Sequence, residues 1–212
     1  MKYRILSLLF FGGICLFANL SYARPKGQQH LPGPADPDEL PAALKKYIPK
    51  GYQVLNVTKG NLNQDQFRDL ILVLNKINEE KTSQVVAHPE KRPLLIFTGT
   101  ADKKYHLAAR NDNAVYCYDC GGMMGDPFMG IVIKKGYFSI EHYGGSNLRW
   151  TRTITFKYTP AEKDWLLYKD GGDRFQASAP DVKPQTKVYT IKDFGHIAFK
   201  DFDVYKEKPV KK

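Results

Sequence analysis

The stretch from Asn61 to Asp69 has the residue types and spacing of a site for a hard cation. It reads NLNQDQFRD and is followed at once by the apolar run LILVL. Side-chain oxygens at its first, third, fifth and ninth positions can converge on calcium, with a backbone carbonyl near the seventh. The candidate ligands are Asn61, Asn63, Asp65, the carbonyl of Phe67, and Asp69. The alternative is an Asx turn, in which the same side chains accept hydrogen bonds from backbone amides and lead into a strand.

Another group of polar and aromatic side chains comes from residues 137–143 and 148–158, which alternate as strands around the four-residue loop 144–147. Alternation directs one face of the second strand to a core, namely Leu148, Trp150, Arg152, Ile154, Phe156 and Tyr158. Arg152 interrupts this apolar face, and a buried guanidinium needs a carboxylate partner. If Tyr143 pairs with Leu148, Glu141 lies diagonal to Arg152, whereas a one-residue slip puts His142 there.

The hairpin residues support two interpretations. In the first they bind an anionic or sugar-like ligand, with arginines making bidentate contacts and Trp150 and Tyr143 stacking on it. That candidate site consists of Glu141, His142, Arg149, Trp150 and Arg152. In the second, which the sequence favours, Glu141 and Arg152 form a buried ion pair with surface residues around it.

Cys117 and Cys120 form a C-x-x-C motif. In an oxidising compartment such a pair indicates a small disulfide loop. A zinc site would need two further ligands, and no second C-x-x-C or H-x-x-x-H motif accompanies this one. The residues that follow are rich in Gly and end in Pro127, whereas a thioredoxin-like redox centre needs a helix start. We therefore expect a structural disulfide, with a redox pair or two free thiols as the alternatives.

The sequence holds no strong catalytic constellation. The histidines follow no H-E-x-x-H spacing, and neither a G-x-S-x-G elbow nor a phosphate loop is present. Asp119 and Asp126 flank the cysteine loop and could act as acids, although Asp residues in Gly-rich segments usually form turns. We expect a protein that is not an enzyme. The alternative is a periplasmic hydrolase that uses Glu141 or the Asp119/Asp126 loop.

The 61–69 stretch and the strand after it resemble the calcium loop of integrin-type FG-GAP and related VCBS repeats. That resemblance implies calcium as a ligand and an extracellular setting. It covers about 14 residues and a single repeat. The stretch departs from the family pattern at Asn61, where an acid is usual, and at Gln66, where a glycine would allow the sharp turn.

The first residues predict export. Lys2 and Arg4 precede the apolar run 5–20 and the small-residue pattern Ser21-Tyr22-Ala23, which is the plan of a secretory signal peptide. The chain has 212 residues and a net charge of +10, so cleavage after residue 23, which removes Lys2 and Arg4, would leave 189 residues with +8. No second apolar run is long enough to span a membrane. We expect a periplasmic or secreted protein.

Changes in composition and in the spacing of apolar residues divide the rest of the chain into segments. We expect a flexible leader over 24–36, a single β-rich domain over 37–205 and a frayed basic tail over 206–212. One N-terminal helix is predicted from Asp36-Pro37 through Leu40, Ala43, Leu44 and Tyr47. Nine strands are predicted over 52–58, 69–75, 93–98, 105–110, 130–134, 137–143, 148–158, 165–169 and 187–191. This pattern predicts a mostly β antiparallel sandwich or meander, with a partial β-propeller-like arrangement as the alternative.

A wider resemblance supports export and a β-rich fold but implies no activity. From about residue 40 to 205, segments such as RPLLIF, LAARNDNAVYC and GYFSIEHYGGSNLRWTRTITFKY resemble an uncharacterised family of small exported bacterial proteins. The excess of basic residues suits an anionic envelope component, and their scatter argues against nucleic acid. The predicted function is therefore non-catalytic binding of an envelope component or a protein partner, with calcium as a possible support.

Overall fold

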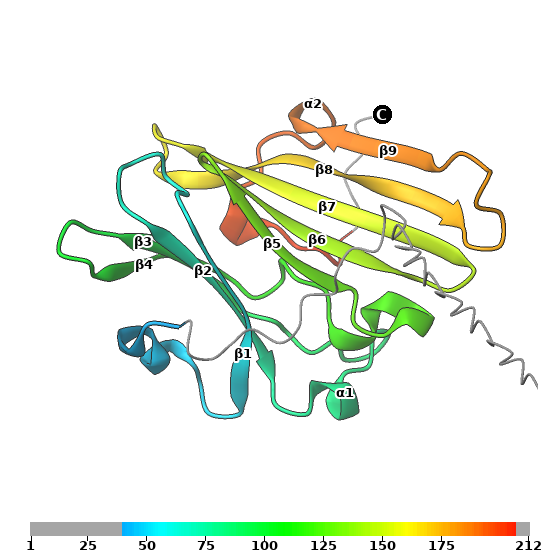
Figure 1. The fold of residues 1–212 in the computed structure, drawn as a ribbon, viewed down its shortest axis with the longest axis horizontal. Coiled ribbons are helices and arrows are strands. Elements are labelled where there is room, and N and C mark those ends of the chain that lie inside the picture. The colour runs from blue at the N-terminus through cyan, green and yellow to red at the C-terminus, as the bar shows by residue number, and fades with distance from the viewer. Residues whose placement is uncertain (1–39, 207–212) are drawn as a thin grey trace, which may run out of the picture. The chain divides into compact units, whose positions relative to one another are not determined.

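Nine strands form two open antiparallel sheets in which each strand pairs with its neighbours along the chain (Figure 1). The computed structural model describes residues 40–206. The predicted signal peptide, the leader and all but the first residue of the tail lie outside the described residues. Within 40–206 neither sheet closes on itself. The predicted mostly β antiparallel fold is confirmed, and the propeller-like alternative is wrong.

The first sheet contains four strands and the second contains five. The first runs in the order β1 (Tyr52–Gly60), β2 (Asp69–Lys76), β3 (Leu94–Gly99) and β4 (Tyr105–Asn111). The second runs in the order β5 (Phe128–Lys134), β6 (Tyr137–Gly145), β7 (Leu148–Thr159), β8 (Asp164–Gln176) and β9 (Gln185–Thr190). All nine predicted strands are present. The largest difference is in β8, which continues well beyond the predicted end at residue 169.

Strand β2 is buried on both faces because a separate core forms on each side of the first sheet. Leu70, Leu72 and Leu74 belong to an outer core, together with Leu40 and Leu44 near the N-terminus. Ile71 and Val73 belong to the main core, where they meet the inner face of the second sheet. Successive residues of a strand point to opposite faces, so the continuous run LILVL fills both cores.

The predicted N-terminal helix is a short 3-10 helix, η2 (Ala42–Tyr47). Its predicted start at Asp36 and Pro37 lies outside the described residues. Leu44 is buried, and the ring of Tyr47 meets Phe97 edge-on at 4.9 Å between centroids. Since a 3-10 helix repeats every three residues, Leu44 and Tyr47 share one side while Ala43 is exposed.

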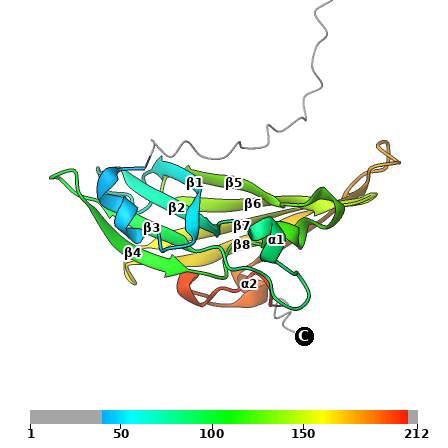
Figure 2. The same cartoon turned by 90° about the horizontal axis from the view of Figure 1, so that it is seen from below.

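Four further short helices lie in the segments that connect or follow the strands. They are α1 (Glu79–Thr82), η3 (Tyr118–Met124), α2 (Ile191–Phe194) and η4 (Phe199–Asp201). The C-terminal segment that includes η4 lies under the second sheet (Figure 2), where Phe199, Phe202 and Val204 join the main core. Within residues 40–206, no helix is long and apolar enough to cross a membrane.

Candidate functional site

The loop over residues 61–69 joins β1 to β2, and its side chains bond to backbone amides. Asn61 Oδ1 accepts from the Gln64 amide at 2.6 Å, and Asp65 Oδ1 accepts from the Phe67 amide at 2.7 Å. Asn63 Oδ1 accepts from the Asp65 amide at 3.1 Å. The positive φ of the loop, 67°, is at Gln64, and not at Gln66, where the resemblance places the sharp turn. These are the hydrogen bonds of Asx turns.

The same loop does not present a converging set of oxygen ligands as it is folded. The Asn63 side chain donates from Nδ2 to the carboxylate of Asp65 at 2.7 Å, and Asn61 donates from Nδ2 to the Asp65 carbonyl. Calcium accepts only oxygen ligands, so these two amide groups would have to turn before a cation could bind. Calcium binding here stays a prediction from the resemblance, and the function derived below does not depend on it.

Asp69 anchors this loop inside the molecule. Its carboxylate is fully buried and accepts from the amides of Leu62, at 2.6 Å, and Gly99, at 2.9 Å. Burial raises the pKa of Asp69 above its ordinary value, against the effect of the two amide donors. The carbonyl of the buried Leu62 in turn accepts from the indole of Trp165 on β8 at 3.0 Å. The loop therefore fastens the first sheet to the second.

The β6–β7 hairpin has a different register from the one considered in the sequence. Tyr143 pairs with Thr151 and not with Leu148. Because β6 continues to Gly145, the predicted four-residue loop over 144–147 is also wrong. His142 lies directly opposite Arg152, while Glu141 lies opposite Thr153.

The sheet separates the five residues of the predicted hairpin site. Residues directly opposite each other share a face, and neighbours along a strand alternate. His142, Trp150 and Arg152 thus point to the inner face, whereas Glu141 and Arg149 point to the outer face. The five side chains do not line one ligand site.

Arg152 has a carboxylate partner, but the partner is Asp170 on β8 and the predicted pairing with Glu141 is wrong. The guanidinium makes two parallel hydrogen bonds to Asp170, at 3.0 and 2.8 Å. Its remaining nitrogen donates to the Tyr116 hydroxyl and, at 3.0 Å, to the Val204 carbonyl. The side chain of Asp170 is 1% exposed, so the pair is a buried element of the fold, as the sequence favoured for Arg152.

His142 is buried beside Arg152 and is uncharged at neutral pH. Its Nε2 accepts from the Tyr116 amide at 3.4 Å, and its Nδ1 has no hydrogen-bond partner among the described residues. Burial lowers the pKa of His142 to about 3, with smaller contributions from the positive charges of Arg152 and Arg92. This histidine is a buried residue on the inner face of the second sheet.

Cys117 and Cys120 lie at the start of η3 as a close pair, with sulfur atoms 2.10 Å and Cα atoms 5.2 Å apart. Asp119 between them accepts from the Ser83 hydroxyl and from the Val85 amide, both at 2.6 Å. The loop that bears Val85 is itself closed by paired backbone hydrogen bonds between Gln84 and His88. Asp119 therefore fastens the cysteine segment to the 84–88 loop.

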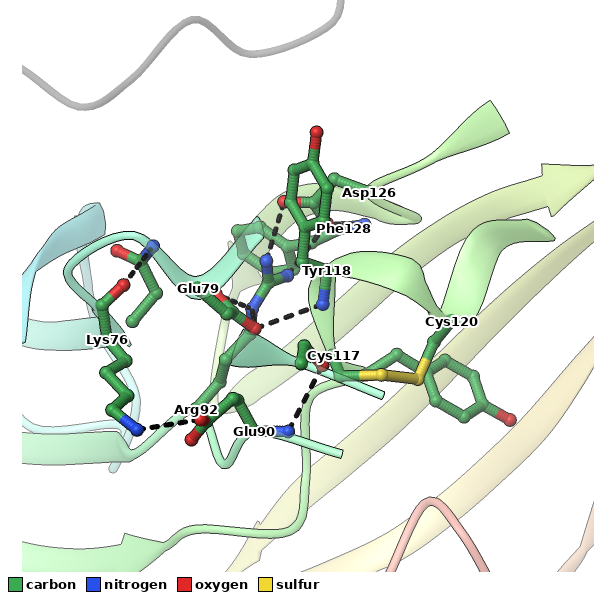
Figure 3. A network of polar contacts seen from close by, with 12 residues as sticks. Lys76, Glu79, Glu90, Arg92, Cys117, Tyr118, Cys120, Asp126 and Phe128 are labelled. Carbon is green, nitrogen blue, oxygen red and sulfur yellow. Dashed lines mark hydrogen bonds and ion pairs between the residues drawn. A yellow bond between two sulfur atoms is a disulfide. The ribbon is translucent and has the colours of Figure 1, made fainter. Parts of the chain in front are cut away.

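Beside the cysteine segment lies a buried charged network that sequence reasoning missed (Figure 3). The side chain of Arg92 is fully buried. It donates from Nε to the Glu79 carboxylate at 2.8 Å and from both terminal nitrogens to Asp126 at 2.7 Å. Glu79 also accepts from the Tyr118 amide at 3.0 Å, and Asp126 accepts from the Phe128 amide at 2.9 Å. One guanidinium thus joins α1 and η3 to the start of β3.

Both carboxylates named as possible catalytic acids have partners within the fold. Asp126 bonds to Arg92, and Asp119 bonds to Ser83 and Val85. Partial burial acts to raise the pKa of Asp119, but the hydrogen bonds that the Ser83 hydroxyl and the Val85 amide donate to it outweigh burial and lower this pKa, so the group stays ionised near neutral pH. A signal in the sequence could have indicated the network, since Arg92 stands directly before the apolar run PLLIF.

The two segments that Asp119 joins expose apolar side chains. Val86 is 96% exposed and Met123 is 88% exposed, and Val85, Tyr118 and Met124 are exposed as well. We call these five residues the apolar ridge. Large exposed apolar patches mark interaction surfaces in soluble proteins, and these side chains lie on two segments that Asp119 joins. Within residues 40–206, by contrast, no three His, Cys, Asp or Glu side chains come together as a metal site.

Comparison with known proteins adds no assignment, because no protein-family model matches the chain and the search of curated proteins found no match. The resemblances to exported bacterial proteins and to FG-GAP and VCBS loops stay predictions.

Proposed function

We propose that this protein is an exported, non-catalytic binding protein that recognises a protein partner in the cell envelope through the apolar ridge. The observation that carries the proposal is the near-complete exposure of Val86 and Met123 on loops that a buried arginine network holds in place. Exposed apolar side chains supply the anchors of protein interfaces. Loops that are already ordered lose less conformational entropy when a partner binds.

Export is part of the proposal and rests on the signal-peptide pattern over residues 1–23. The placement of Cys117 and Cys120 at bonding distance supports it, since a disulfide persists outside the cytoplasm. The proposed disulfide joins the first residues of η3 and restricts the movement of this segment, which ends at Met123 and Met124.

The contacts of the candidate acids favour binding over hydrolysis. A general acid or base must reach its substrate with a free proton-transfer atom. Asp119 and Asp126 instead hold the two loops together through short hydrogen bonds. Glu141, the other candidate of the alternative hydrolase, lies on the outer face of the second sheet, opposite Gly130 and Thr153.

Site-specific photo-crosslinking in cells that export the protein tests the proposal. A photoreactive residue is placed at Val86, at Met123 or, as a matched control, at Val182, which is 64% exposed in the loop before β9. We expect one discrete adduct from positions 86 and 123 and none from 182. Purified wild-type protein in excess should suppress the adduct, whereas the Val86→Asp/Met123→Asp double variant should not.

Two results would overturn the proposal. One is the absence of a discrete adduct from both ridge positions when the protein is exported at normal levels. The other is an adduct that forms equally from position 182 or that the double variant suppresses as well as the wild type does. The circular dichroism spectra and melting temperatures of the double variant and the wild type establish that both competitors are folded.

A further inference from the structure

The outer face of the second sheet carries an ordered array of side chains that the apolar ridge does not use. The inner face of this sheet is filled by the main core. Cross-strand register assigns the outward residues of the two central strands, which run side by side in Figure 1. They are Tyr137, Ser139, Glu141 and Tyr143 on β6, and Arg149, Thr151, Thr153, Thr155 and Lys157 on β7. None of these nine residues is buried.

One end of this face is an aromatic platform with a cation over it. The rings of Tyr137 and Tyr168 meet edge-on with centroids 5.3 Å apart. Lys157 Nζ lies 5.6 Å from the Tyr137 centroid and 5.9 Å from that of Tyr168. Tyr168 is 47% exposed. Such rings offer apolar faces to a flat ligand while the ammonium group offers a positive charge.

The middle of the face is lined by hydroxyl groups. Ser139 and Thr155 lie directly opposite each other, and their hydroxyl oxygens are 2.8 Å apart. The next outward pair along the two strands consists of Glu141 and Thr153, and Thr153 is exposed. A hydroxyl group both donates and accepts hydrogen bonds and a carboxylate accepts them, so this row complements a ligand that is itself covered in hydroxyl groups.

The other end repeats the pairing of a cation with an aromatic ring. Arg149 donates to the Tyr143 hydroxyl at 2.7 Å, and its guanidinium lies 5.8 Å from the centroid of that ring. Tyr137 and Tyr143 are six residues apart on one strand, which corresponds to about 20 Å at the rise of an extended chain. The array therefore suits an elongated ligand that lies along β6 and β7.

Charge on this face is unbalanced towards the positive. The register places four basic residues outward: Lys134, Arg149, Lys157 and Lys169. The register places three acids outward, Glu141, Asp164 and Asp173, and Asp173 already accepts from the Thr186 hydroxyl at 2.6 Å. An anionic ligand is therefore complementary to the face.

We propose that this face binds an extended polysaccharide that bears carboxylate groups. Its sugar rings lie on the aromatic ends, its hydroxyl groups meet the Ser and Thr row, and its carboxylates meet Lys157 and Arg149. A small molecule would require a concave pocket, which an open sheet face does not provide. A protein would require an apolar centre of the kind that the ridge has and this hydroxyl-lined face lacks.

Isothermal titration of the mature protein with polygalacturonate, and with neutral dextran of matched length, tests this inference. We expect binding of polygalacturonate that weakens as salt is raised, and at least about tenfold weaker binding of dextran. The Lys157→Gln/Tyr168→Ala variant should lose at least about tenfold in affinity for polygalacturonate. Lys183→Gln/Val182→Ala in the loop before β9 is the matched control and should bind like the wild type.

Three results would overturn the inference. They are no heat of binding with polygalacturonate, equal losses in the face variant and the control, and equally tight, face-dependent binding of double-stranded DNA of matched charge. The last would mark the face as a general polyanion surface. Melting temperatures within a few degrees of the wild type establish that the variants are folded. The ridge is unchanged in these variants, so failure here leaves the crosslinking result intact, and the reverse also holds.

Discussion

Arg92 and Asp126 make two parallel hydrogen bonds of 2.7 Å each, and Asp126 stands two positions after the end of η3. The same guanidinium bonds to Glu79 at the start of α1. Arg92 is fully buried, and the two acids that it joins balance its charge. Burial lowers the pKa of Arg92 and the two carboxylates raise it, with a net rise. Arg92 therefore stays positively charged, and the positions of α1 and of the segment after η3 depend on that charge.

Replacement of Arg92 by methionine should destabilise the protein strongly. Methionine fills similar volume but leaves Glu79 buried without its cation, and removal of one partner of a buried pair costs about 3–5 kcal/mol. The free energy of unfolding from urea titration measures this loss. Arg110→Met is the control, because Arg110 pairs with Asp112 at 2.7 Å on the surface and such pairs contribute about 0–1 kcal/mol. Similar losses in the two variants would contradict a structural role for the network.

His142 should make the protein sensitive to acid. Its pKa is about 3 in the folded protein against an ordinary 6.5, so between these values the unfolded chain binds a proton that the folded chain excludes. This contribution to stability is complete above pH 6.5 and is lost as the pH falls towards 3, by at most about 1.4 kcal/mol per pH unit. Burial raises the pKa of Asp69 and Glu79, which acts in the opposite direction, so the comparison must be made against a variant.

The His142→Gln variant isolates this contribution. Glutamine keeps an acceptor for the Tyr116 amide but does not titrate. We expect the free energy of unfolding of the wild type to fall more steeply with acidification than that of the variant. His106→Gln, at an exposed position on β4, should follow the wild type. Parallel curves for wild type and His142→Gln would show that His142 does not control acid stability.

Local pattern was sufficient to predict the strands, and long-range pairing was not. The alternation along β7 correctly assigned Ile154 and Phe156 to the core face. The partner of Arg152 was mispredicted because the β6–β7 register depends on where β6 ends, and Asp170 is supplied by another strand. Glu79 and Arg92 are 13 residues apart, and no short motif links them. The sites that depend on contacts between distant segments were therefore the ones that the sequence did not reveal.

The hydrogen bonds of the 61–69 loop, in contrast to its resemblance to FG-GAP loops, predict that calcium at several millimolar leaves the melting temperature of the protein unchanged. The side-chain oxygens of Asn61, Asn63 and Asp65 accept hydrogen bonds from backbone amides. Asn63 also donates from its NH2 group to the carboxylate of Asp65. A cation would have to displace these bonds with only two carboxylates in the loop, Asp65 and Asp69. Differential scanning fluorimetry with calcium, and with magnesium as the control, measures the effect. A rise with calcium that Asp65→Asn abolishes would instead support the FG-GAP-like reading of the loop.

Gly172 should be essential for the length of β8. The pair Gly171-Gly172 suggests a turn, yet both residues are paired with β9. A Cβ at position 172 would lie 1.9 Å from the Thr151 carbonyl oxygen, so a side chain would push β8 away from β7 and from Thr151 on the outer face. Gly172→Ala is expected to lower the free energy of unfolding by about 1–3 kcal/mol, the range for overpacking at a tight site.

Gly51→Ala is the control: a Cβ there meets nothing within 4 Å, and only its positive φ of 87° adds strain, costing about 1 kcal/mol. Hydrogen exchange should locate the Gly172→Ala effect in the amides of β8 and β9. If those amides keep their wild-type protection while stability falls, the close approach of the two strands is not the cause.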